Sequence, residues 1–232
     1  MSLKNIKLDL PTYRATVPSS QKEVSIIPFK VKDEKLLLIA SESKNEQQLI
    51  DSMKKVIDNN VVGEDVNNLY SYDIEYLFLR IRAISIGETS NIQLKCKECE
   101  TANDVVIDLT TVNVINLDSF NNKIKLTDTL MFQMDPPNLD KYVGVGNDIE
   151  SLTRFLATNV SKVFHGDEIY DVGPSDIDDV INIMNELTAE QFQGIQTYVD
   201  TLPKLSHDVN FVCTHCGTDN SQNIQGLSNF LA

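Results

Sequence analysis

Cys96-Lys-Glu-Cys99 and Cys213-Thr-His-Cys216 are the two stretches that decide the fold of this chain, because together they contain all four of its cysteines. Alternating, strand-like sequence precedes each pair. Two residues between the cysteines let both sulfurs of a tight turn face one cation, and two such turns supply the four thiolates of a tetrahedral zinc site. We therefore predict that Cys96, Cys99, Cys213 and Cys216 bind one structural Zn²⁺ ion.

The distance along the chain between the two pairs indicates a divided module. A stretch of 113 residues separates Cys99 from Cys213, which is far more than a simple zinc ribbon contains. We expect a zinc-ribbon-like module with four cysteine ligands that is split by an inserted subdomain. Because the ligands come from distant segments, metal binding would be part of folding.

Other uses of the cysteines stay open at this stage. A redox dithiol would need its first cysteine at a helix N-terminus, whereas strands are expected here. Disulfide bonds would need an oxidising compartment, and reduced thiols without a metal are a further alternative. His207 and His215 lie near the second pair and could replace a sulfur, but four cysteines already complete the coordination. Such a closed site leaves no position for a catalytic water.

Composition and charge narrow the class of protein. The 232 residues are 41% hydrophobic and 23% charged, which is ordinary for a globular protein. The 34 acidic residues outnumber 20 basic ones, giving a net charge of −14 that argues against binding to a nucleic-acid backbone. No apolar run is long enough to span a membrane, and the N-terminal sequence lacks an apolar leader, so we expect no export by that route.

Motifs for catalysis are missing from the sequence. It contains no phosphate-binding loop, dinucleotide-binding glycine pattern or nucleophile elbow. An acidic cluster invites a calcium-site interpretation but lacks the ligand spacing, so it is read as a solvated helix start; it comprises Asp167, Glu168, Asp171, Asp176, Asp178 and Asp179. We expect no enzyme, no small-molecule substrate and a role in protein–protein contacts.

The periodicity of apolar residues predicts an α+β fold. Residues 8–40 read as extended chain and strands, although the run from Lys35 to Ala40 also fits the start of a helix. Helices are predicted for 46–58, with Asn45 as N-cap, and from Ser71 or Asp73 to Ala83. No internal repeat is apparent.

The segment between the cysteine pairs is expected to form its own part. Two or three strands are predicted within 112–134, followed by helices over 148–164, from Pro174, and after a capping box at Thr188. The division is therefore an N-terminal α/β part with the first knuckle (1–111), a mixed insertion (112–205), and the second knuckle with the tail (206–232). Leu227, Phe230 and Leu231 make the tail either a docking segment or part of the core.

Five phrases of the sequence resemble one protein family. They are Pro28-Phe-Lys-Val-Lys-Asp-Glu-Lys-Leu-Leu-Leu-Ile-Ala, Tyr72-Asp-Ile-Glu-Tyr-Leu-Phe-Leu-Arg-Ile-Arg-Ala-Ile-Ser-Ile-Gly-Glu, Leu187-Thr-Ala-Glu-Gln-Phe, Leu202-Pro-Lys-Leu and Gly226-Leu-Ser-Asn-Phe. In this order, from about residue 10 to the end, they resemble the T4-type bacteriophage baseplate hub proteins. The four cysteines fall on the metal-binding version of that family's pattern.

The resemblance implies a non-enzymatic protein of a contractile phage tail. It would contact other hub or tail proteins, either as a hub component or as a hub assembly factor. It would act in the host cytoplasm during assembly and could stay in the virion tail baseplate. The alternative from the residues alone is an acidic zinc-ribbon protein that binds nucleic acid or assists transcription, which the net charge disfavours.

Overall fold

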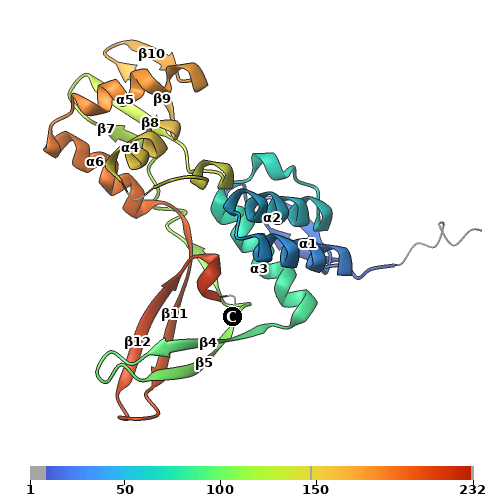
Figure 1. Cartoon of the computed structure of the whole chain (residues 1–232). Coiled ribbons are helices and arrows are strands. Elements are labelled where there is room, and N and C mark those ends of the chain that lie inside the picture. The colour runs from blue at the N-terminus through green and yellow to red at the C-terminus, as the bar shows by residue number, and fades with distance from the viewer. Residues whose placement is uncertain (1–8, 147, 231–232) are drawn as a thin grey trace, which may run out of the picture. The chain divides into compact units, whose positions relative to one another are not determined.

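The chain folds into two compact units, which are described here from a computed structural model covering residues 9–146 and 148–230. Unit 1 comprises residues 1–114 and 205–232, and unit 2 comprises residues 115–204 (Figure 1). Over the described residues, six α-helices and several small sheets make the fold a mixed α+β architecture. The α+β class predicted from the sequence is therefore confirmed.

The N-terminal part of unit 1 combines a small sheet with three helices. The antiparallel sheet has the order β1-β2-β3, and these strands are Tyr13–Thr16, Glu23–Ile26 and Val61–Val62. Helices α1, α2 and α3 span Val31–Ser43, Glu46–Asn60 and Ser71–Ile86, and a 3₁₀ turn, η2, spans Val66–Asn68. Ile74, Leu77 and Ile81 recur at helical spacing in α3 and are almost fully buried, so this face of the helix belongs to the core.

Helix α1 corrects the expectation of extended chain up to residue 40. The buried Asp33 carboxylate accepts a hydrogen bond from the backbone N–H of Lys30 at 3.0 Å, which stabilises the first turn. The Lys-Leu-Leu-Leu-Ile-Ala run consists mainly of good helix formers. A short apolar run does not distinguish helix from strand by periodicity, and here the capping interaction decides.

The N-cap of α2 is the predicted Asn45, whereas the N-cap of α3 is Tyr70 and the predicted Asp73 bonds back to it. Asn45 is the N-cap of α2 and accepts a hydrogen bond from the Gln48 N–H at 3.0 Å. Helix α3 begins at Ser71, where Asp73 accepts from the Tyr70 N–H at 3.0 Å. The second oxygen of Asp73 accepts from the Ser19 N–H at 2.9 Å, which ties α3 to the N-terminal segment.

Two long hairpins complete unit 1. Strand β4 (Thr89–Lys95) pairs with β5 (Ala102–Asp108), and β11 (Lys204–Val212) pairs with β12 (Asp219–Gln225). The short strand β6 (Asn113–Ile115) adds to the second hairpin, in the order β12-β11-β6. In Figure 1 the two hairpins run in different directions and their turns lie close together at the lower left.

The described part of the tail packs on unit 1. The 3₁₀ turn η5 (Leu227–Phe230) contacts α3 and β4, and Phe230 is fully buried. The Glu75 carboxylate of α3 accepts a hydrogen bond from the Leu227 N–H at 3.2 Å. Of the two interpretations of the tail, these contacts favour core packing for residues 227–230; Leu231, like residues 1–8, lies outside the described residues.

Unit 2 is an antiparallel sheet covered by helices. The sheet order is β10-β9-β8-β7, from Glu168–Asp171, Val160–His165, Leu130–Met134 and Lys123–Lys125. The helices are α4 (Ile149–Thr158), α5 (Ile177–Asn185) and α6 (Ala189–Thr201), with 3₁₀ turns η3 (Leu139–Tyr142) and η4 (Pro174–Asp176). Phe132, Met134 and Ile195 are fully buried at the centre of the core.

The helix predicted over 148–164 is shorter than expected. It ends at Thr158 because the Asn159 side chain hydrogen-bonds to the Phe155 carbonyl at 2.9 Å and the Asn159 carbonyl accepts from the Asp135 N–H at 2.8 Å. The chain then turns into β9, whose Val160 and Val163 are buried against β8. Strand pairing outweighs the helical apolar period here, since β-branched residues suit a sheet. The acidic cluster is divided accordingly, with Asp167, Glu168 and Asp171 in the β9–β10 hairpin and not at a helix start.

Candidate metal centre

The tips of the two hairpins bring four sulfur atoms together. The Sγ atoms of Cys96, Cys99, Cys213 and Cys216 all lie within 4.8 Å of one another. Cys96 and Cys216 are 3.7 Å apart, and Cys99 and Cys213 are 3.6 Å apart, so each of these pairs joins the two hairpins. Cys96 and Cys213 are buried, whereas Cys216 is exposed.

The two turns that carry the cysteines have matching backbone geometry. The Cys96 N–H donates to the Thr101 carbonyl at 2.9 Å, and the Cys213 N–H donates to the Thr218 carbonyl at 2.9 Å. The residue after the second cysteine has a positive φ in both turns, 57° at Glu100 and 72° at Gly217. This left-handed residue turns the chain back into the outgoing strand.

A short sequence pattern accompanies this geometry. Cys-x-x-Cys-x-Thr-x-Asn occurs at 96–103 and again at 213–220. No internal repeat was predicted from the sequence, because only four of the eight positions are identical and the flanking strands differ. The threonine and asparagine at equal offsets from the cysteines were the signal that could have revealed it.

Asn103 and Asn220 each reach across to the opposite turn. Asn103 accepts hydrogen bonds from the Thr214 N–H at 2.8 Å and its hydroxyl at 2.9 Å, and its amide group lies 3.8 Å from the Cys213 sulfur. Asn220 accepts from the Lys97 N–H at 2.9 Å, and its amide lies 3.5 Å from the Cys96 sulfur. Both side chains are buried. The arrangement is reciprocal, so each hairpin orients a ligand-bearing turn of the other.

Backbone N–H groups favour the thiolate form at two of the cysteines. The pKa of the Cys213 thiol is lowered to about 6, chiefly by the hydrogen bond from the Cys216 N–H. The pKa of Cys96 is lowered chiefly by the Cys99 N–H and then by the Glu98 N–H, which lies 3.4 Å from its sulfur. A thiolate is the form of cysteine that binds a metal.

The donor set fits a tetrahedral metal ion. Zinc–sulfur bonds of about 2.3 Å place the sulfurs at the corners of a tetrahedron with edges of roughly 3.8 Å, close to the separations between the hairpins. These separations are too long for a disulfide bond, which measures about 2.05 Å. The first cysteine of each pair follows a strand and not a helix start, unlike a redox dithiol.

The two histidines near the second pair take other positions. His207 is a half-buried residue of β11, and His215 is exposed in the turn. Within the described part of the chain, neither belongs to the sulfur cluster. The site therefore has four sulfur donors, and the four residues named from the sequence are the ones brought together.

The fold and the sulfur cluster define a mixed α+β protein whose two hairpins could hold a metal ion between them. Comparison with protein families gives a match over residues 10–232 to the T4 bacteriophage base plate protein family. The chain belongs to this family, which confirms the family resemblance seen in the sequence. No curated protein and no solved structure matches it.

Membership suggests a structural protein of the phage baseplate and virion tail. A baseplate family implies contacts with other tail or baseplate proteins, and such families are generally non-enzymatic. Among the described helices, none has the length and apolar character needed to cross a bilayer.

Proposed function

We propose that the chain is a component of the baseplate hub, or a factor that assembles the hub, and that a structural zinc ion clasps its two hairpins. The observation that carries the zinc assignment is the pair of sulfur–sulfur distances of 3.6 and 3.7 Å between turns 113 residues apart in sequence. Four closely spaced sulfurs suit zinc, which favours soft ligands in a tetrahedral site.

The bound ion would supply a cross-link and no reaction chemistry. Cys96, Cys99, Cys213 and Cys216 fill all four positions, so none is left for a water or substrate. Asn103 and Asn220 orient the two turns from outside the ligand set, as partners of ligands do in other metal sites. The resulting split zinc-ribbon-like module joins the segments 1–111 and 206–232 on either side of the insertion 112–205.

The hub role rests on family membership and on the acidic charge. A protein of net charge −14 is suited to contacts with basic protein surfaces and poorly suited to nucleic acid. The partners would be other hub or tail proteins, met in the host cytoplasm during assembly or in the contractile tail of the virion. No membrane or small-molecule substrate is part of the proposal.

Two measurements test the zinc site and the hub role separately. Metal analysis of the purified protein should find one zinc per chain, and loss of zinc in Cys213→Ser is the matching control. Mass spectrometry of purified virions and of assembly intermediates should find the protein with hub proteins. A phage that lacks the gene and still builds infectious tails would overturn the hub role and leave the zinc site untouched.

A further inference from the structure

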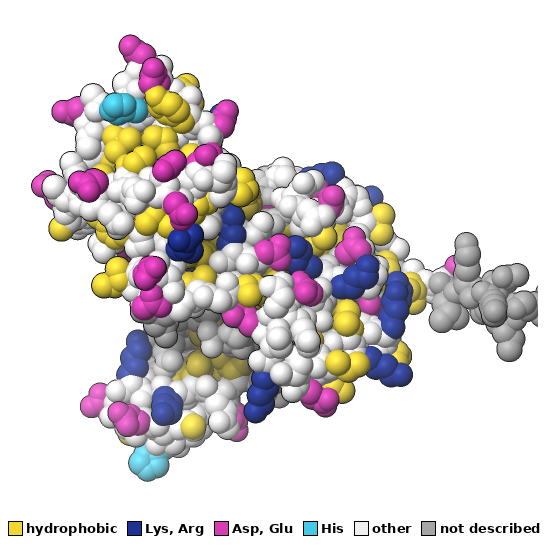
Figure 2. Space-filling view, turned by 45° about the horizontal axis from the view of Figure 1, so that its top comes forward, with side chains coloured by type: hydrophobic (Ala, Val, Ile, Leu, Met, Phe, Trp, Pro, Cys, Tyr) yellow, Lys and Arg dark blue, Asp and Glu magenta, His cyan; other side chains and the backbone are white. Residues whose placement is uncertain are grey.

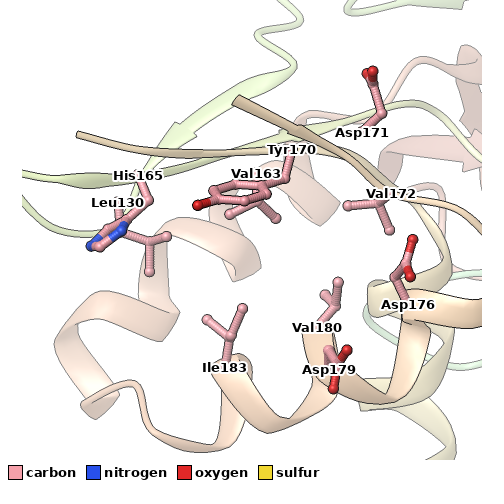
Figure 3. A pocket seen from close by; sticks show the side chains of 10 residues that line it. All are labelled: Leu130, Val163, His165, Tyr170, Asp171, Val172, Asp176, Asp179, Val180 and Ile183. Carbon is pink, nitrogen blue, oxygen red and sulfur yellow. The ribbon is translucent and has the colours of Figure 1, made fainter. Parts of the chain in front are cut away.

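Unit 2 contains an apolar pocket between the β9–β10 hairpin and helix α5. Its volume is about 630 Å³. Leu130, Val163, Val180 and Ile183 form its floor, and Figure 3 shows the valine and isoleucine side chains directed into the space between the hairpin and α5. Figure 2 shows hydrophobic side chains gathered in this region of the surface, with acidic groups around them. The pocket lies outside the cysteine module, in a unit with its own core.

The rim of the pocket is polar and acidic. Asp179 is exposed on α5, and Asp176 directs one oxygen to the Gly173 N–H at 2.8 Å. The Tyr170 ring stands on the opposite side, where its hydroxyl donates to Glu168. Among the described residues that line the pocket there is no lysine or arginine.

Two cations, one on the β9–β10 hairpin and one beside α5, are already paired with aspartates. Lys162 and Asp171 are neighbours across β9 and β10, and their ion pair of 2.8 Å lies on the face of the sheet opposite Val163. Arg154 of α4 pairs with Asp178 at 3.0 Å. Within the described pocket lining, the carboxylates of Asp176 and Asp179 at the rim therefore have no lysine or arginine as a neighbour.

Unit 2 as a whole carries most of the acidic excess of the chain. Residues 115–204 contain 15 acidic and six basic residues, so this unit accounts for −9 of the net charge of −14. Covering the rim with a neutral or acidic surface would bury carboxylates without a partner, which is unfavourable. A second copy of this acidic chain is disfavoured for the same reason.

We infer that this pocket is a docking site for a segment of another protein in which apolar side chains alternate with lysine or arginine. The apolar side chains rest on Val163, Val180 and Ile183, while the cationic groups reach Asp176 and Asp179. Strand β10 lies at the edge of its sheet and all four of its residues are exposed, so an extended segment can run beside it. This inference goes beyond the hub role and depends on neither the zinc site nor the family.

Methyl NMR of the full-length protein tests the inference with two synthetic peptides. The basic probe is acetyl-Gly-Arg-Leu-Arg-Leu-Arg-Gly-amide, and its acidic twin carries glutamate in place of each arginine. We expect saturable shifts of the Val163, Val180 and Ile183 methyl signals with the basic probe alone, and weaker binding at higher salt. Equal binding of both peptides, or no binding of the basic probe at millimolar concentration, overturns the inference.

Matched variants decide whether the acidic charge of the rim is responsible for binding of the basic probe. Asp179→Lys should weaken binding of the basic probe at least about fivefold, because it places a like charge at the rim. Asp200→Lys on α6 changes the net charge by the same amount at an exposed position outside the pocket and should change the affinity less than twofold. Ile183→Ala should weaken binding with both rim charges retained. Equal losses for Asp179→Lys and Asp200→Lys would show a non-specific charge effect and contradict the assignment.

Discussion

The paired hairpins of unit 1 and the sheet of unit 2 differ in the interactions that stabilise each of them. Unit 2 has a continuous apolar core that includes Phe132, Leu156, Val180 and Ile195. Where the tips of the hairpins meet, by contrast, hydrogen bonds and sulfur–sulfur contacts join them. Asn103 and Asn220 each hydrogen-bond to the opposite turn, Gln222 donates to the Lys95 carbonyl at 2.6 Å, and the Lys97 ammonium donates to the Ser221 carbonyl. An isolated two-stranded hairpin is marginally stable in water. We therefore expect unit 2 to fold on hydrophobic burial and the tips of the hairpins to depend on the metal ion proposed for their cysteines.

The largest effect that we expect is on the stability of the hairpin module, and it distinguishes unit 1 from unit 2. Cys213→Ser removes one of four sulfur ligands, and apparent metal affinities of such sites correspond to roughly 10–16 kcal/mol. We expect loss of bound zinc, rapid amide exchange in β4, β5, β11 and β12, and a fall of at least about 10 °C in the melting temperature of unit 1. Metal analysis, calorimetry and hydrogen exchange check this.

The control for this prediction is Ser221→Ala, at an exposed position of β12. It should retain zinc and melt like the original protein. If Cys213→Ser exchanged its amides as slowly as the original protein, the dependence of the hairpins on a metal would be refuted.

Phe132→Ala should destabilise unit 2 and leave the zinc site of unit 1 intact, which is the opposite of the effect of Cys213→Ser. Phe132 is fully buried in the core of unit 2, and truncation of such a residue costs about 3–5 kcal/mol. We expect unit 2 to melt first while the protein still holds its zinc. Exchange protection in β8 and β9, measured beside zinc content, tests this; simultaneous loss of zinc would show that the two units fold as one.

Asn103→Ala and Asn220→Ala should have an intermediate effect limited to the hairpin module. Removal of groups that orient metal ligands typically lowers metal affinity about 10- to 100-fold. Chelator competition measures the affinity, and the spectrum of the Co²⁺-substituted protein reports the ligand geometry. Asn91→Ala, at an exposed position of β4, is the matched control. Equal affinities for Asn91→Ala and the two other variants would remove the role assigned to the reciprocal contacts.

The smallest effect concerns Glu75, which links α3 to the tail. Burial raises the pKa of this carboxyl, although the hydrogen bond from the Leu227 N–H acts in the opposite direction. Because the folded pKa lies above the unfolded one, the contribution of Glu75 to stability is greatest below the unfolded pKa and is lost as the pH rises through the folded pKa.

We therefore expect Glu75→Gln, which keeps the acceptor oxygen, to stabilise unit 1 slightly at pH 8 relative to the original protein. The difference should vanish toward pH 4. Urea denaturation of both proteins at several pH values measures it, with the unit 2 transition as internal reference. If Glu75→Gln were less stable than the original protein at pH 8, the predicted direction of the stability change would be contradicted.

Several local features could be predicted because they depend on residues close together in sequence. The N-cap at Asn45, the capping box at Thr188 and the turns that carry the cysteines are of this kind. The two cysteine turns were also predictable, since the spacing of the cysteines alone indicates each turn, whereas zinc binding by the four residues stays a prediction. The reciprocal role of Asn103 and Asn220 was not, because their partners are more than 100 residues away.

By itself, the sequence determined the family, the α+β class and the four sulfur residues, because these follow from short patterns and composition. The tertiary structure decided where the helix after Asp148 ends, since pairing of β9 with β8 competes with the helical period there. It also decided that the two hairpins place sulfur beside sulfur, and that an acidic rim surrounds an apolar floor in unit 2. These features arise from contacts between distant segments, whose free energies no local pattern contains.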